Sequence, residues 1–228
     1  MKEDILRRIR SALGENGGAA GAKLHEASRS GQPATARSGA DTDHRALASR
    51  FEAELKSIGG QFYAAASDDD ARAYVLNLAA ARSVQSAVGW NCGVIGDLGL
   101  DEALEHGGIA FTRDTGSEEF LRQCIDAGLG ISGVDYALAD SGTLVVLSGP
   151  GQARSVSLLP PVHVALVRPK QVLADLNDLF PMLKQREALN SAIAFITGPS
   201  RTADIEMTLV VGVHGPQQLH VVMLGFKD

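Results

Sequence analysis

From His44 onward, apolar residues recur along the chain at helical and strand-like spacings that alternate with each other. Apolar residues three and four positions apart, ended by capping or glycine residues, predict helices, and short apolar runs between them predict buried strands. In the first half, this pattern predicts helices over 44–58, 68–82, 100–106 and 115–126. The strands that it predicts between these helices cover 61–65, 84–88 and 108–111.

The second half is richer in short apolar runs separated by turn residues. We predict strands over 130–134, 136–139, 142–147, 162–167, 192–197 and 219–224. We also predict a helix over 170–183, which Pro181 kinks or ends early. Strands that alternate with helices predict an α/β fold, in which a mostly parallel sheet is covered by helices on both faces. The hairpin-like run over 136–147 predicts that this sheet is mixed.

Composition divides the chain into three parts. Residues 1–13 are an amphipathic helix candidate, whose apolar face carries Ile5, Leu6, Ile9 and Leu13. Residues 14–43 are rich in Gly, Ala and Ser, so they cannot bury enough surface to offset the entropy lost on ordering. We therefore predict a flexible linker there and one folded domain over 44–228. The first helix either docks on another subunit or packs on its own domain.

The overall composition excludes some classes of protein. Of the 228 residues, 45% are hydrophobic, which suffices for one sizeable core. The formal net charge of −6 argues against a nucleic-acid protein, which would present a basic face. No stretch reaches the roughly 18 consecutive apolar residues of a membrane span, and the first residues contain no signal-peptide run. We therefore expect a cytoplasmic protein that inserts into no membrane and binds no nucleic acid.

The two cysteines, Cys92 and Cys124, are too few for a metal centre. They form no CxxC pair, and no cluster of His or Cys flanks them. A zinc site or an iron–sulfur cluster takes about three or four such ligands. We therefore expect no metal and no cofactor in this chain, and two buried free thiols in preference to a disulfide.

A first candidate for chemistry is the turn between the predicted strands at 136–139 and 142–147. This turn contains Asp140, Ser141, Gly142 and Thr143. A glycine flanked by small hydroxyl side chains lets backbone amides approach an anion, so the turn is a candidate anion site. The alternative is a tight hairpin turn without a ligand.

A second candidate precedes and begins the predicted strand at 162–167. Arg154 either binds a carboxylate or phosphate or is simply solvated. Two adjacent prolines, Pro160 and Pro161, fix an extended path before the strand. His163 then follows, near the sheet edge, either as a catalyst or as a structural histidine.

The most distinctive polar stretch covers residues 197–214. If this stretch is extended, alternate residues share a face, and Thr202 and both carboxylates, Asp204 and Glu206, project from the same one. Paired carboxylates suit proton transfer, nucleophilic attack or metal binding, because like charges push their pKa values apart. The alternative is a polar strand face, or a capped helical turn that begins at Ser200 or Thr202.

Taken together, these stretches resemble one protein family. The runs that carry the resemblance are GISGVDYALADSGTLVV at 130–146, SLLPPVHVALV at 157–167, GPSRTADIE at 198–206, GVHGP at 212–216 and LHVVML at 219–224. In this order, they resemble the lactate utilization (LUD) domain family. The short length and the lack of ferredoxin-type cysteines resemble the C branch of that family.

The resemblance implies a Rossmann-like α/β fold similar to the NagB, RpiA and CoA-transferase group. It also implies a role in oxidising L-lactate to pyruvate, beside partner proteins that carry iron–sulfur clusters, with this chain as a non-redox subunit. The catalytic candidates among the motif positions are Glu206, Asp204 and His163. The candidates for binding a small anionic metabolite are Asp140, Ser141, Gly142, Thr143, Arg154, Ser200, Thr202, His214 and Gly215.

Two alternative functions stay open. In the first alternative, the chain is a stand-alone enzyme similar to CoA transferases or sugar-phosphate isomerases, with Glu206 as nucleophile or base and Asp204 as its neighbour. In the second, it is a regulatory or assembly module. The enzyme hypothesis requires residues 197–214 to lie beside the Asp140 turn, so that backbone amides and both acids converge on one hollow.

Overall fold

The structure is a computed structural model that describes residues 43–186, 192–203, 209–212 and 215–226. The helix predicted over 1–13 lies outside these residues, as does the predicted linker except for its last residue, Asp43. The Asp43 carboxylate accepts hydrogen bonds from the backbone N–H groups of Arg45 and Ala46, and so caps the first described helix. Within the described residues, no helix is long and apolar enough to cross a membrane.

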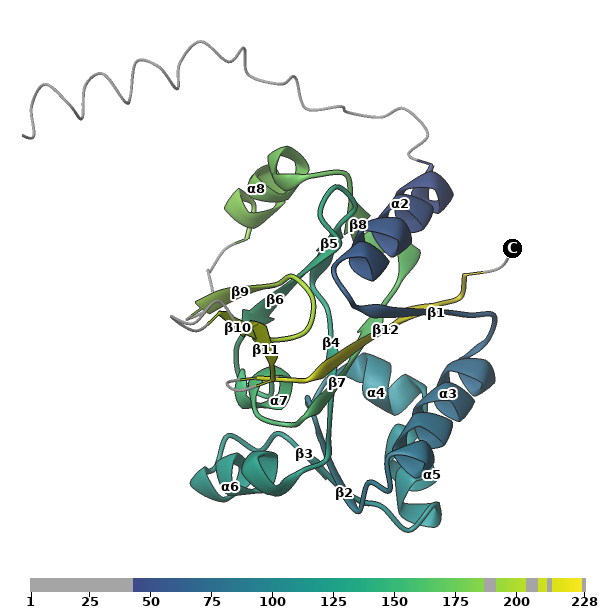
Figure 1. Cartoon of the computed structure of the whole chain (residues 1–228), viewed down its shortest axis with the longest axis vertical. Coiled ribbons are helices and arrows are strands. Elements are labelled where there is room, and N and C mark those ends of the chain that lie inside the picture. The colour runs from purple at the N-terminus through teal and green to yellow at the C-terminus, as the bar shows by residue number, and fades with distance from the viewer. Residues whose placement is uncertain (1–42, 187–191, 204–208, 213–214, 227–228) are drawn as a thin grey trace, which may run out of the picture. The chain divides into compact units, whose positions relative to one another are not determined.

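Six parallel strands form the central sheet, in the order β1-β12-β7-β4-β2-β3 (Figure 1). Their bounds are β1 Gln61–Ala65, β2 Ser86–Gly89, β3 Ala110–Arg113, β4 Leu129–Gly133, β7 Val162–Val167 and β12 Gln218–Leu224. Along the chain, the sheet grows outward from β2 to β3, then returns past β2 to β4 and continues through β7 to β12. The direction of winding therefore reverses between β2 and β4. In open sheets of this kind, ligands bind beyond the carboxyl ends of the strands at such a reversal.

Helices cover both faces of the central sheet (Figure 1). One face packs against α3 Asp68–Ala81, α4 Gly93–Asp97 and α5 Leu100–His106. The other face packs against α2 His44–Ser57, α6 Glu118–Asp126, α7 Ser155–Leu158 and a second sheet. This arrangement confirms the predicted α/β fold with a mostly parallel sheet between layers of helices.

The antiparallel strands lie in a second sheet, whereas the sequence predicted one mixed sheet. This sheet has the order β8-β5-β6-β9. Its strands are β5 Tyr136–Leu138, β6 Thr143–Ser148, β8 Val172–Leu173 and β9 Ala192–Ile196. A separate hairpin pairs β10 Arg201–Ala203 with β11 Leu209–Val211. The second sheet stays apart from the central one because Ala137 and Leu144 pack into a core with Phe51 and Leu55 of α2.

The helix predicted over 170–183 is wrong in its first half. A short 3-10 helix, η1 Pro169–Gln171, leads into strand β8, and α8 begins only at Leu176 and continues through Pro181 to Lys184. The Asp175 carboxylate accepts hydrogen bonds from the N–H groups of Asn177 and Asp178, which starts the helix at that point. Strand β5 offers a free edge to Val172, and this tertiary pairing overrides the helical spacing.

The turn at Asp140 packs tightly against the last turns of α2. Gly142 has a φ of +62°, and a Cβ built on it would lie 2.4 Å from the backbone nitrogen of Leu55. A side chain at this position would therefore meet backbone rather than a flexible neighbour. The glycine of the motif is explained by this close approach of two backbones.

We expect Gly142→Ala to lower the free energy of unfolding by about 3 kcal/mol or more, because positive φ costs a non-glycine residue about 1–3 kcal/mol and the clash adds to it. The matched control is Gly116→Ala, which has a φ of +71° but open space around its Cβ. The control should cost about 1 kcal/mol. Urea unfolding of both variants measures the difference, and equal losses would refute the close contact with α2.

Candidate functional site

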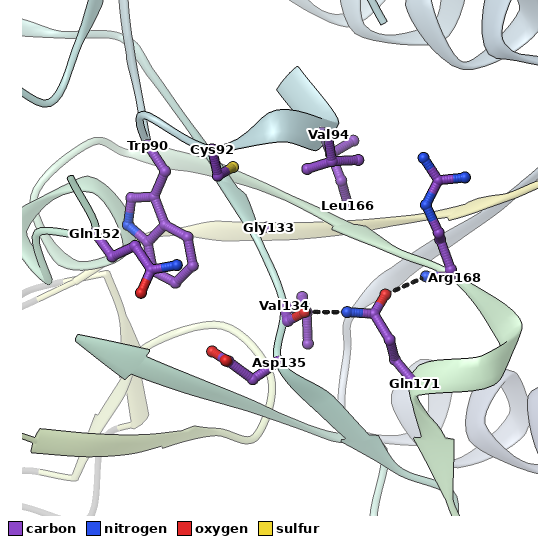
Figure 2. A pocket seen from close by; sticks show the side chains of 10 residues that line it. All are labelled: Trp90, Cys92, Val94, Gly133, Val134, Asp135, Gln152, Leu166, Arg168 and Gln171. Atoms are coloured by element: carbon purple, nitrogen blue, oxygen red, sulfur yellow. Dashed lines mark hydrogen bonds between the residues drawn. The ribbon is translucent and has the colours of Figure 1, made fainter. Parts of the chain in front are cut away.

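A cavity of about 180 Å³ lies at the carboxyl ends of β2, β4 and β7 (Figure 2). It therefore adjoins the reversal of winding between β2 and β4, where the topology favours a ligand site. Its lining residues follow or end these strands, with one contribution from the loop after β6. They are Trp90, Cys92 and Val94, then Gly133, Val134 and Asp135, then Leu166, Arg168 and Gln171, and finally Gln152.

The loop after β7 is fixed to the loop after β4 by one side chain. The Gln171 carboxamide donates a hydrogen bond from Nε2 to the backbone oxygen of Val134 (Figure 2). Its Oε1 accepts a hydrogen bond of 2.7 Å from the backbone N–H of Arg168. Both the oxygen and the nitrogen of this carboxamide are therefore hydrogen-bonded, and the side chain holds two walls of the cavity in position.

The loop after β6 is fixed in the same way over the end of β2. Trp90 is only 2% exposed, and its Nε1 donates a 3.0 Å hydrogen bond to the backbone oxygen of Ala153. The buried Asp114, which follows β3, accepts a 2.7 Å hydrogen bond from the Ala153 backbone N–H. The backbone N–H of Asn91 donates to the oxygen of Gly151 at 2.8 Å. These bonds place Gln152 at the rim of the cavity.

The two charged residues that line the cavity differ in how far their charges are neutralised. Asp135 accepts hydrogen bonds from the Leu147 backbone N–H at 2.8 Å and from the Arg186 guanidinium at 3.1 Å. The guanidinium of Arg168 is half exposed, and its described ion pair, with Asp97, has a long N–O distance of 3.7 Å. An exposed pair of this length contributes about 0–1 kcal/mol, so Arg168 can leave it for a ligand at little cost.

Cys92 contributes a neutral thiol to the cavity wall. Burial raises the pKa of this thiol above its ordinary value, although the backbone N–H groups of Ile95, Gly133 and Val94 act in the opposite direction. Both cysteines are free in the structure, and Cys124 is buried. The Cys92 wall therefore carries no negative charge that would repel an anion near neutral pH.

Most of the chain matches one known protein family. The model of the LUD domain matches residues 48–224. The chain belongs to the LUD domain family. This confirms the resemblance drawn from the motifs, and the match covers the whole central sheet.

Several curated relatives of this LUD domain are named lactate utilization protein C. The one from Halalkalibacterium halodurans is 41% identical over 139 residues, which are 59% of this chain and 60% of the relative. The one from Macrococcus caseolyticus is 40% identical over 146 residues, 61% of this chain and 62% of the relative. The matched part therefore spans about 60% of the length of these relatives.

A solved structure supports the fold of this LUD domain. The crystal structure of a DUF162 family protein from Deinococcus radiodurans aligns with a TM-score of 0.54. The alignment covers 80% of this chain and 98% of that one, at 15% sequence identity. At this identity, the likeness concerns the fold alone.

The structure brings some of the motif residues together, but away from the cavity. Thr143 and Thr197 share a hydrogen bond of 2.9 Å between their hydroxyl groups, beside the end of α2. Ser200 lies against Gly215, whose Cβ would come within 3.0 Å of the Ser200 Cβ. None of the motif candidates among the described residues lines the cavity, since the Asp140 turn lies at the far end of β6 from Gln152.

The remaining candidates of the motif lie away from the cavity or outside the described residues. Asp204, Glu206 and His214 are outside the described part of the chain. The backbone of Thr202 pairs with Val210 in the β10–β11 hairpin. The remaining described candidates differ in exposure, with Asp140 and Arg154 exposed, Ser141 partly buried and Gly142 buried.

His163 lies in the interior and not near the sheet edge, where the sequence predicted it. It is 0% exposed in β7, which has strands on both sides. Its Nε2 forms a 2.8 Å hydrogen bond with the Ser132 hydroxyl, and its Nδ1 has no hydrogen-bond partner among the described residues. Burial lowers the pKa of His163 to about 4, so the ring is neutral at physiological pH.

The residues of the cavity were missed because most of them lie outside the motif runs, and those inside the runs, such as Asp135, form no pattern that indicates chemistry. Trp90, Asp135 and Arg168 each follow the end of a parallel strand by one or two positions. The signal that could have found them is this position, because side chains just after parallel strands meet at one edge of the sheet. Their convergence depends on the strand order, which local sequence does not specify.

The buried His163 should make stability fall in mild acid. The unfolded histidine binds a proton below a pKa of about 6.5, whereas the folded one stays neutral down to about pH 4, so the free energy of unfolding falls as the pH drops through this window. Between pH 7.5 and pH 5, we expect the free energy of unfolding of His163→Gln to fall by about 2 kcal/mol less than that of wild type.

Urea unfolding at the two pH values measures this effect. His106→Gln, which removes an exposed histidine of α5, is the matched control. Some dependence will remain in the His163 variant, because burial also lowers the pKa of His220 to about 4. A loss in His163→Gln equal to that of wild type would refute a neutral, buried His163.

Proposed function

We propose that this LUD domain protein is a component of an L-lactate utilization system, in which it is a non-redox subunit beside iron–sulfur partner proteins. The observation that carries the proposal is its similarity to proteins named lactate utilization protein C. The curated relatives with this name are 34–41% identical over their matched parts. The cavity at the reversal of winding gives such a subunit a place to hold a small metabolite.

The proposed division of labour follows from the chemistry of the oxidation. Converting L-lactate to pyruvate breaks the C2–H and O–H bonds and releases a pair of electrons and two protons. The electrons require an acceptor, and the two cysteines of this chain are fewer than the roughly four that an iron–sulfur cluster takes. We therefore assign the acceptor to clusters in the partner proteins, and the cytoplasm to the assembly.

The size of the cavity favours a short organic acid as its ligand. Its volume of about 180 Å³ is small beside the roughly 300–1,000 Å³ of typical cofactor and drug sites. A three-carbon acid fits this space, whereas a CoA thioester extends far beyond it. This favours the lactate hypothesis over the CoA-transferase alternative.

The proposal predicts that the purified chain does not oxidise L-lactate, and that an affinity-tagged chain copurifies from lactate-grown cells with proteins that show iron–sulfur absorbance. The mixture should reduce an artificial electron acceptor when L-lactate is added. Deleting the gene should stop growth on L-lactate and leave growth on glucose unchanged. Lactate oxidation by the purified chain alone, or normal growth of the deletion strain on L-lactate, would overturn the proposal.

A further inference from the structure

We infer that the cavity at the ends of β2, β4 and β7 binds a short monocarboxylate that carries an oxygen on C2, and that Arg168 binds its carboxylate. The choice of L-lactate and pyruvate as the natural acids rests on the proposed function. The choice of a carboxylate rests on the described cavity itself.

The charges of the cavity favour one small anion. Asp135 is already paired with Arg186 and with the Leu147 backbone N–H, so it neither demands a cation nor strongly repels an anion. Within the described part of the chain, the guanidinium of Arg168 has just one ion pair, the long and exposed one with Asp97. A guanidinium group binds a carboxylate through two parallel hydrogen bonds, which a long single contact to Asp97 does not provide.

The cavity has an apolar wall and a polar wall. Trp90, Val94 and Leu166 present ring and aliphatic surface, which suits the methyl group of a three-carbon acid (Figure 2). The side chain of Gln152 has no hydrogen-bond partner among the described residues, and it lines the cavity beside Trp90, from the loop after β6 (Figure 2). Its carboxamide can donate to a ketone or hydroxyl oxygen on C2, and can accept from a hydroxyl.

The position of Arg168 is suited to capture a ligand from solvent. Its backbone N–H is fixed by Gln171, while its half-exposed guanidinium extends away from Gln171, toward the side of the cavity that Val94 lines (Figure 2). The charged group is therefore free to turn on a fixed backbone. The neutral Cys92 thiol across the cavity adds no repulsion to an incoming carboxylate.

The test is a calorimetric titration of the full chain at pH 7 with L-lactate, pyruvate, propionate and inorganic phosphate. We expect L-lactate and pyruvate to bind more tightly than propionate, which lacks the C2 oxygen, and more tightly than phosphate. Arg168→Gln should weaken the binding of both acids at least tenfold. The matched control is Arg122→Gln, which changes an exposed arginine of α6 and should bind as wild type does.

Two further variants separate the roles of the walls. Gln152→Ala should remove the preference for L-lactate over propionate while keeping the carboxylate affinity for propionate. Val94→Phe should fill the cavity and block both acids with Arg168 intact. Circular dichroism and thermal unfolding verify that each variant is folded. Wild-type affinity in folded Arg168→Gln, or tighter binding of phosphate than of either acid, would overturn the inference.

Failure of the proposed binding site and failure of the proposed function give different results. If the chain is needed for growth on L-lactate and copurifies with iron–sulfur proteins, but binds neither acid, only this inference fails. If the chain binds the acids through Arg168 but the deletion strain grows normally on L-lactate, the site stands and the proposed function fails.

Discussion

Strand β4 pairs in parallel with β2 on one side and β7 on the other, and this pairing positions the loops that form the cavity. Parallel strands cannot be joined by tight turns, so each connection crosses a face of the sheet, and all carboxyl ends emerge at one edge. The connection after β2 runs outward to β3, whereas the connection after β4 runs the other way to β7. The connections that leave these two adjacent strands therefore diverge. The loops part at that point, and the cavity lies there.

Hydrogen bonds between the loops fix the walls of the cavity. Gln171 joins the loops after β4 and β7, and Asp114 and Trp90 hold the loop after β6. These side chains and backbone groups satisfy each other, so the cavity walls are fixed by polar contacts at the edge of an apolar core. Arg168 is left loosely paired in the same place, and this combination of fixed walls and an available cation supports a role in binding a small anion.

The polar motif runs of the sequence have different roles in the structure. Gly142 meets the backbone of α2, and His163 forms a buried pair with Ser132 in the middle of the sheet. Gly142 is explained by packing, because a side chain there would meet the backbone of α2, and the buried His163 does not line the cavity. The predicted acids, Asp204 and Glu206, stay a prediction, since they lie outside the described residues. The motifs therefore identified the family more reliably than they identified the cavity.

Most local elements and the family could be predicted from the chain of residues without knowledge of the fold. Strand β1 and the start of α3 at Ser67 follow from short-range patterns of apolar and capping residues, so they were predictable without neighbours. The tertiary structure alone decided that β5 and β6 leave the central sheet, that Val172 joins a strand, and that residues near 90, 135 and 168 line one cavity. These features arise from hydrogen bonds and packing between segments far apart in the chain, which local spacing cannot encode.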